Sequence, residues 1–205
     1  MSHSSRLLQE RYGDHAIPEQ APWSPVLESL LGHRSVRAYL DRPLPEGTLE
    51  TLLAAAQSAA TSSNQQAWSV IAVRDPARKA RLSALANNQA HIRQAPLLLV
   101  WLADFSRVQR RADAHGVELE AVHYTDSLLT ASIDAALAAQ NAVVALESLG
   151  LGGVYIGALR NHLSAVIEEL GLPPLVYPVF GLCVGYPDPE RPAAVKPRLP
   201  QGVVL

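Results

Sequence analysis

The sequence predicts an α+β fold in which a small mixed sheet is flanked by helices. Four short apolar runs rich in β-branched residues are typical of strands, at residues 68–73, 96–102, 154–157 and 176–185. Longer stretches with apolar residues at helical spacing separate them. Strands separated by long helices indicate layers of helix and sheet around a shared core.

The helices follow from apolar spacing and from glycine and proline at their ends. Residues 6–12 and 26–31 predict two short helices, with a proline-containing turn at residues 21–25 between them. Residues 48–60 predict a helix that ends in the polar run TSSNQQ. Residues 75–88 and 160–170 predict two more, the second closed by Gly171 and two prolines.

Residues 118–149 predict one long helix, or two with a break near Tyr124. Its second half is rich in alanine and carries charge only at Asp134 and Glu147. Such a helix must be covered nearly all round, and one monomer of this size does not readily supply that cover. The last residues, 186–205, are too rich in proline for regular structure apart from a terminal VVL edge strand.

The length of 205 residues predicts one domain over 1–205, with an N-terminal extension at 1–24 and an extended C-terminal segment at 186–205. With 17 basic and 19 acidic residues and only two phenylalanines, the chain lacks the surface of a nucleic-acid-binding protein. The longest uncharged stretch, residues 51–73, contains TSSNQQ in its middle, which argues against a membrane span.

Cys183 is the only cysteine, so no intrachain disulfide can form, and the first residues lack the apolar core of a secretory signal. These features predict a soluble protein of the cytoplasm. The seven histidines show no metal-type pairing, so no metal site is expected. Cys183 lies within an apolar strand, where a core role is favoured over a nucleophilic one.

Two cationic motifs lie far apart in the chain. HRSVR places His33, Arg34, Ser35 and Arg37 after a helix, where their donors could converge on one anion. KPRLP adds Lys196 and Arg198 in an extended segment that could complete the same site. Taken alone, HRSVR is more typical of a solvated loop at a helix C-terminus, whereas KPRLP is equally typical of a disordered basic tail.

Two polar or flexible motifs complete the candidates. TSSNQQ offers amides and hydroxyls that suit a neutral polar ligand edge, although a helix-ending turn has the same composition. GLGGVYIGALRN lacks the glycine order of a dinucleotide fold and a P-loop lysine. Its glycines therefore permit close approach of backbone to something flat, or simply turn the chain.

Taken together, these motifs resemble the FMN-dependent nitroreductase family, in its branch of oxygen-insensitive nitroreductases and NADPH:FMN oxidoreductases. Five blocks occur in the family's order over nearly the whole chain: GHRSVRAYLDRPLPEG, the Ser/Gln loop, DAALAAQNAVVALESLGLGGVYIGALRN, VFGLCVGYP and KPRLP. The resemblance implies a nitroreductase-like fold and an intertwined homodimer with two FMN sites at the subunit interface.

The resemblance also implies which residues hold FMN. Those matching His33, Arg34, Ser35 and Arg37 hold its phosphate, ribityl chain and pyrimidine edge, and those matching Lys196 and Arg198 hold the phosphate. Those matching Ser62, Ser63 and Gln66 come from the other subunit. Gln89 matches a glutamine beside the flavin, and Tyr155, Ile156 and Gly157 match backbone that approaches the ring.

The implied activity is ping-pong: NADPH or NADH gives a hydride to N5 of FMN and leaves, and a nitroaromatic, quinone or flavin then accepts electrons. FMN carries the chemistry, so no catalytic acid or base is expected from the protein. Relatives in that branch continue past KPRLP with arginines for the NADPH 2′-phosphate, whereas this chain stops at Leu205, so strict NADPH preference is not expected. The alternatives are a flavin-binding storage or sensor module without efficient NAD(P)H turnover, and a flavin-fragmenting or dehydrogenase relative on the same fold.

Overall fold

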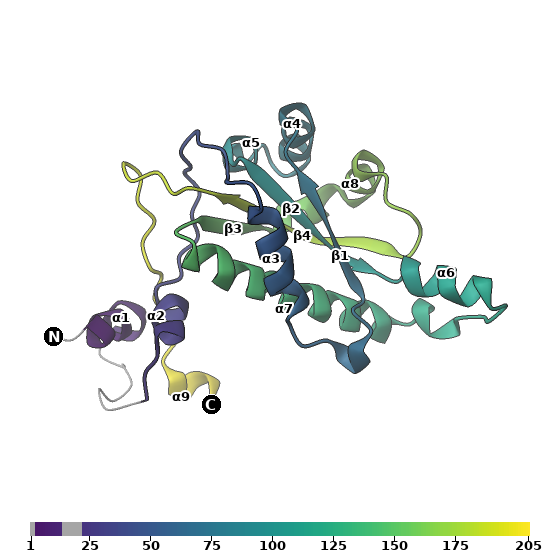
Figure 1. Ribbon diagram of the computed structural model, residues 1–205, viewed down its shortest axis with the longest axis horizontal. Helices are drawn as coiled ribbons and strands as arrows, with labels where there is room; N and C mark the ends of the chain where they lie inside the picture. The colour runs from purple at the N-terminus through teal and green to yellow at the C-terminus, as the bar shows by residue number, and fades with distance from the viewer. Residues whose placement is uncertain (1–2, 14–21) are drawn as a thin grey trace.

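The computed structural model describes residues 3–13 and 22–205 (Figure 1). The four strands are β1 (Trp68–Val73), β2 (Leu97–Asp104), β3 (Gly152–Ile156) and β4 (Val176–Gly185). The α-helices are α1 (His3–Tyr12), α2 (Pro25–Leu31), α3 (Thr48–Gln57), α4 (Pro76–Leu85), α5 (Ala90–Gln94), α6 (Ser106–Ala114), α7 (Thr125–Ser148), α8 (Leu163–Leu170) and α9 (Gln201–Val204). Short 3-10 turns are η2 (Ser62–Asn64), η3 (Glu120–His123) and η4 (Gly157–His162).

The strands form one sheet in the order β1-β2-β4-β3, and every neighbouring pair is antiparallel. The sheet is therefore mixed only through an isolated parallel bridge between Ser35 and Gly153 at its β3 edge. All residues of the central strand β2 are buried, because both faces of the sheet are covered.

Helices cover the two faces in separate layers (Figure 1). On one face, Leu97, Leu99 and Trp101 pack against α3 and the alanine-rich side of α7. On the other, Leu98 and Val100 pack against α4, α5 and α8. The alternation along β2 follows from the two-residue period of a strand, which divides its side chains between two cores. The result confirms the predicted α+β class.

The long helix α7 covers the sheet with one side only. Its alanines at 135, 138, 139 and 142 are fully buried, whereas Leu129, Ile133 and Leu137 are 56%, 57% and 42% exposed. By length and composition alone α7 could cross a membrane, but its buried face packs on the sheet as the core helix of the fold. The prediction that one chain does not cover this helix is confirmed.

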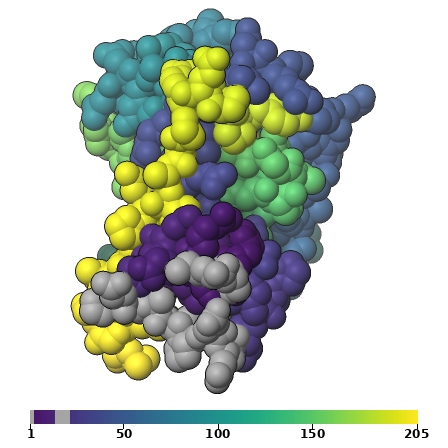
Figure 2. All heavy atoms as spheres, turned by 90° about the vertical axis from the view of Figure 1, so that its left-hand side faces the viewer, coloured from purple at the N-terminus to yellow at the C-terminus, as the bar shows by residue number. Residues whose placement is uncertain are grey.

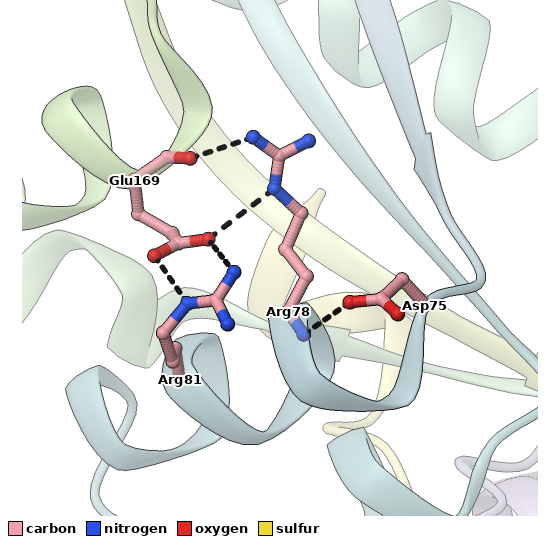
Figure 3. A network of polar contacts seen from close by, with 4 residues as sticks. All are labelled: Asp75, Arg78, Arg81 and Glu169. Atoms are coloured by element: carbon pink, nitrogen blue, oxygen red, sulfur yellow. Dashed lines mark hydrogen bonds and ion pairs between the residues drawn. The ribbon is translucent and has the colours of Figure 1, made fainter.

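An ion-pair network fixes α4 against α8 at the surface (Figure 3). The Arg81 guanidinium donates to both carboxylate oxygens of Glu169, at 2.7 and 2.9 Å, and Arg78 donates to that carboxylate and to the Glu169 carbonyl. Asp75 caps α4 by accepting from the Arg78 amide at 2.7 Å. These hydrogen bonds, chiefly with Arg81, lower the pKa of Glu169. The network orients the helices and adds little stability, because its arginines are exposed.

Several element boundaries differ from the predictions. Helix α6 was not predicted, because its sequence SRVQRRADA buries little and shows no broad apolar face. The terminal VVL run lies in the short helix α9 and its end, not in an edge strand, and its amides bond locally: Val203 donates to the Pro200 carbonyl and Leu205 to that of Gln201. The helix expected at 75–88 ends at Leu85, where Asn87 and Asn88 take positive φ and turn the chain into α5.

Other predictions of local structure are confirmed. Strands β1 and β4 have the predicted bounds, and the long segment breaks at Tyr124 into η3 and α7. The prolines expected to turn the chain at 21–25 are Pro22 and Pro25, and Pro25 begins α2; residue 21 lies outside the described residues. Residues 14–21 of the predicted N-terminal extension also lie outside them.

Candidate functional site

The HRSVR segment lies against the β3 edge of the sheet. The Val36 amide donates to the Gly153 carbonyl at 2.9 Å, next to the Ser35–Gly153 bridge. A Cβ added to Gly152 would lie 2.5 Å from Cγ2 of Val36, so only glycine lets the segment approach this closely. Gly152 therefore serves the packing of HRSVR on β3.

His33 is held by a carboxylate from the end of α7. Its Nδ1 lies 2.6 Å from Oε1 of Glu147, and both side chains are largely buried. Glu147 lies in the last turn of α7, where the helix dipole disfavours a negative charge, so a hydrogen-bond donor at this point stabilises it. The predicted site residue His33 is thus fixed by contact with a helix over 100 residues away in sequence.

The structure divides the two arginines of HRSVR. Arg34 and Val36 line a hollow of about 260 Å³ together with Glu28 and Glu147. In an extended segment alternate side chains point in opposite directions, so Arg34 shares the side of Val36 while His33, Ser35 and Arg37 share the other. The Arg34 side chain therefore lies in this hollow, and its part in the cofactor site stays a prediction.

Arg37 and Gln89 belong to the same neighbourhood. Gln89 immediately precedes α5, and its Oε1 lies 3.1 Å from Nε2 of His91. Burial, and then the charge of Arg37, lower the pKa of His91, which shows that Arg37 lies close to this pair. The Gln89 carbonyl accepts from the Ser83 hydroxyl at 2.9 Å, which fixes the start of α5.

The KPRLP segment lies beside HRSVR, and a residue that the sequence reasoning missed joins them. The Arg11 guanidinium donates to the carbonyls of His33 and Lys196, each at 2.8 Å. Arg198 donates its amide to the Arg11 carbonyl at 2.8 Å. Helical spacing is the sequence signal that could have identified Arg11, because Arg11 follows Leu7 and Leu8 on the buried side of α1.

The site carries a surplus of positive charge. Within residues 3–13 and 22–205, no carboxylate lies within ion-pair distance of Arg34, Arg37, Lys196 or Arg198. All four side chains are exposed. Unpaired guanidinium and ammonium groups on two adjoining segments suit an anion such as a phosphate.

The end of β3 adds an aromatic residue and a glycine. Tyr155 is 37% exposed, and its ring meets Phe180 edge to face with centroids 5.1 Å apart. Burial raises the pKa of Tyr155 well above its usual range. Ile156 is buried, and Gly157 begins η4, where an added Cβ would lie 3.3 Å from the Arg160 guanidinium.

The TSSNQQ loop lies at the opposite end of the sheet from HRSVR. Trp68, just after the loop, pairs with Ala103, whereas Gly153 beside Ser35 pairs with Val184 and so lies level with Leu97. Between Leu97 and Asp104, β2 rises about 23 Å. One chain therefore does not bring Ser62, Ser63 and Gln66 to HRSVR.

A buried carboxylate holds the loop on α7. Asp134 is 1% exposed and accepts from the amides of Ser62 and Ala67, at 3.0 and 3.1 Å. Its neighbour Ile133 belongs to the exposed apolar face of α7. The loop and this apolar face are thus joined through one turn of the helix.

Cys183 lies in the core of β4, as predicted. It is fully buried, and this burial raises its pKa to about 12. A thiol with so high a pKa is almost entirely protonated near neutral pH and is a poor nucleophile.

A model of the nitroreductase family matches residues 30–186, which include HRSVR, the Ser/Gln loop, α7 and β4. The chain belongs to the nitroreductase family. The match begins after α1 and ends before KPRLP. Helix α1, which carries Arg11, and the KPRLP segment that Arg11 binds therefore both lie outside it. The predicted family membership is confirmed.

Named relatives agree with this assignment. This nitroreductase is 44% identical over 180 residues to an FMN reductase (NADPH) of Bacillus subtilis, covering 87% of this chain and 72% of the relative. It is 43% identical over 183 residues to an oxygen-insensitive NADPH nitroreductase of Salmonella typhimurium, covering 89% and 73%. The solved NADPH:FMN oxidoreductase of Vibrio harveyi complexed with NAD+ superposes with a TM-score of 0.82 at 38% identity, covering 89% of this chain and 76% of that one.

Proposed function

We propose that this nitroreductase is an FMN-dependent NAD(P)H oxidoreductase whose cofactor is held between two copies of the chain. The observation that carries the proposal is the set of unpaired cations on HRSVR and KPRLP, two segments held side by side. A phosphate would supply the missing negative charge. Relatives of similar sequence are named for FMN and for NADPH.

The polar residues of the site fit the parts of FMN in turn. Lys196 and Arg198 supply cations for the phosphate, and Arg37 supplies a cation for N1 and O2 at the pyrimidine edge. His33 and Ser35 supply further polar groups on the same side as Arg37. Arg34 adds charge from the opposite side of the segment. The Gln89 amide suits the pyrimidine edge, because it offers both a donor and an acceptor.

The backbone of Tyr155, Ile156 and Gly157 borders the place assigned to the flavin ring. Gly157 carries no side chain, so backbone here can approach a flat group closely. Bound FMN supplies the redox chemistry by accepting a hydride from NAD(P)H and passing electrons to an oxidant. The protein's part is to bind, orient and shield.

No side chain is assigned as a catalytic acid or base. Two carboxylates beside the proposed contacts are already engaged, Glu147 by His33 and Asp134 by the loop before β1. A group held in this way is poorly placed to exchange protons with a substrate. This agrees with a reaction in which the cofactor carries the chemistry.

A second copy of the chain completes the site. The loop residues Ser62, Ser63 and Gln66 lie too far from HRSVR to contact a cofactor bound there by the same chain. They are held beside the exposed apolar face of α7. Pairing two such faces would bury Leu129, Ile133 and Leu137 and carry each loop toward the partner's cations. The homodimer is therefore part of the proposed function.

The reductant is NADPH or NADH, and the oxidant is a small molecule such as a nitroaromatic, a quinone or free flavin. The cytoplasm, where reduced nicotinamides are available, is the proposed location. The single buried cysteine is compatible with that reducing compartment.

The visible spectrum of the purified protein tests the proposal, before and after anaerobic addition of NADPH and then NADH. Flavin absorption that bleaches with either nicotinamide is the expected result. Retained flavin absorption with both would favour a storage or sensor module. Absence of flavin binding even after FMN is supplied would overturn the proposed function.

A further inference from the structure

Arg11 is a buried cation that binds three backbone carbonyls from two distant segments. Its side chain donates to the carbonyls of Leu31, His33 and Lys196, at 2.6, 2.8 and 2.8 Å. The residue is 4% exposed. Its own carbonyl accepts from the amide of Arg198 at 2.8 Å, so it contacts KPRLP through backbone and side chain alike.

This arrangement requires a guanidinium. The planar group has five N–H donors in a fixed fork, so it can serve carbonyls on both segments at once, whereas a lysine ammonium has one nitrogen. No carboxylate within the described ranges, 3–13 and 22–205, forms an ion pair with Arg11. The hydrogen bonds of its side chain all go to backbone carbonyls, which they hold in place.

The arrangement also has an electrostatic cost. Burial, and then the neighbouring charge of Arg198, lower the pKa of Arg11, and the charges of Tyr12, Glu147 and Glu10 offset only part of this effect. Confining a cation beside Arg198 is unfavourable unless the geometry that it creates has another use. A bound anion would offset that repulsion.

Figure 2 shows the consequence for the shape of the molecule: α1, in purple, lies against the yellow C-terminal segment and beside the violet segment of α2. The two cationic motifs are more than 150 residues apart in sequence, and α1 lies where they meet. Helix α1 therefore bridges them.

We propose that Arg11 is a positioning residue of the cofactor site. It joins HRSVR and KPRLP into one phosphate-binding cluster, so that α1 contributes to cofactor binding. The inference rests on the proposed binding of FMN. It assigns a role to the N-terminal extension, which lies outside the match to the family model. Arg11 itself does not contact the phosphate.

The test compares the affinities of FMN and riboflavin, which differ only by the phosphate. The variants are Arg11→Ala and Arg11→Lys, with Arg6→Ala as the control because Arg6 is exposed on the same helix. Flavin fluorescence titration gives both dissociation constants. We expect Arg11→Ala to reduce the preference for FMN over riboflavin by about tenfold or more, and Arg6→Ala to leave it unchanged.

A merely structural role would weaken both ligands alike, so an unchanged preference in Arg11→Ala would overturn the inference. If Arg11→Ala does not fold, Arg11→Lys, which keeps the charge, decides by the same comparison. The double variant Lys196→Ala with Arg11→Ala should lose little more of the preference for FMN over riboflavin than Lys196→Ala alone, because both residues act on one cluster. A wild-type protein that binds neither flavin would instead overturn the proposed function.

Discussion

The Asp134 carboxylate accepts a hydrogen bond from the Thr61 hydroxyl at 2.6 Å, which joins the middle of α7 to the loop before β1. The loop it holds is conformationally unusual, because Ser63, Asn64 and Gln66 all have positive φ. Left-handed backbone costs about 1–2 kcal/mol per non-glycine residue, so the loop depends on contacts such as this one. Asp134 thus presents the polar loop on the same helix as the exposed apolar face.

Asp134→Asn is expected to destabilise the protein by about 2 kcal/mol or more. Each carboxylate oxygen of Asp134 faces a backbone N–H, from Ser62 or from Ala67. Either orientation of an asparagine would therefore turn its NH₂ toward a donor, leaving buried groups unsatisfied. Urea unfolding measures the change. Asp126→Asn, exposed in the first turn of α7, is the control, and an equal effect in both would contradict this account.

Ile133→Glu is expected to convert a dimer into a monomer. Ile133 is 57% exposed in the single chain, so the change disturbs no core, but it would bury a carboxylate between two subunits. Multi-angle light scattering after gel filtration measures the mass. Val108→Glu, at an exposed apolar residue of α6, is the matched control. A dimer that survives Ile133→Glu would place the interface elsewhere.

Arg37→Ala and Lys196→Ala are each expected to weaken FMN binding by about 1.5–3 kcal/mol, the cost of one charge-assisted hydrogen bond. Neither residue has a carboxylate partner among the described residues, so the loss should be confined to ligand binding. Isothermal titration calorimetry measures it. Arg111→Ala on α6 serves as the control, and unchanged affinity in both site variants would reject the assignment.

Gly152→Ala is expected to destabilise the protein by about 1–3 kcal/mol through overpacking and to weaken FMN binding with it. The new methyl group would lie 2.5 Å from Cγ2 of Val36 and 3.0 Å from Pro187, forcing HRSVR away from β3. Thermal unfolding and FMN titration measure both effects. Adding Val36→Ala should restore only part of the lost stability, because it removes Cγ2 of Val36 but leaves its Cβ, which would lie 2.8 Å from the new methyl group. Gly202→Ala, with open space around it, should be neutral.

Asp104 is expected to contribute stability that is lost in acid. Burial raises its pKa, but hydrogen bonds from Ser106 and Ser69 outweigh that effect and lower the pKa overall. A carboxyl whose pKa is lower when folded stabilises the protein above the unfolded value of about 3.9, and this contribution disappears as the pH falls through the folded value. Between pH 7 and pH 3, urea unfolding should show a smaller loss of stability for Asp104→Asn than for wild type. Asp41→Asn, at an exposed position, should follow the wild-type curve.

Local pattern was enough for most of the secondary structure. The strands at 68–73 and 176–185 follow from β-branched apolar runs, and the break at Tyr124 lies where the helical pattern changes. Helix α6 was missed because it packs mainly through Ser106 and Ala112, so no apolar face marks it. The order of the motifs along the chain also sufficed to identify the family.

The composition of the candidate site was predictable from the sequence, but its arrangement was not. The sequence by itself determined which residue types gather in HRSVR, KPRLP and TSSNQQ, because composition and spacing are local properties. Only the tertiary structure decided that Arg34 lines a hollow with Glu28 and Glu147, that Asp134 holds the loop, and that Arg11 joins two segments more than 150 residues apart. The reason is physical: buried arginine and aspartate side chains here bind backbone groups, and every residue carries the same backbone, so nothing in the sequence marks which one they will meet.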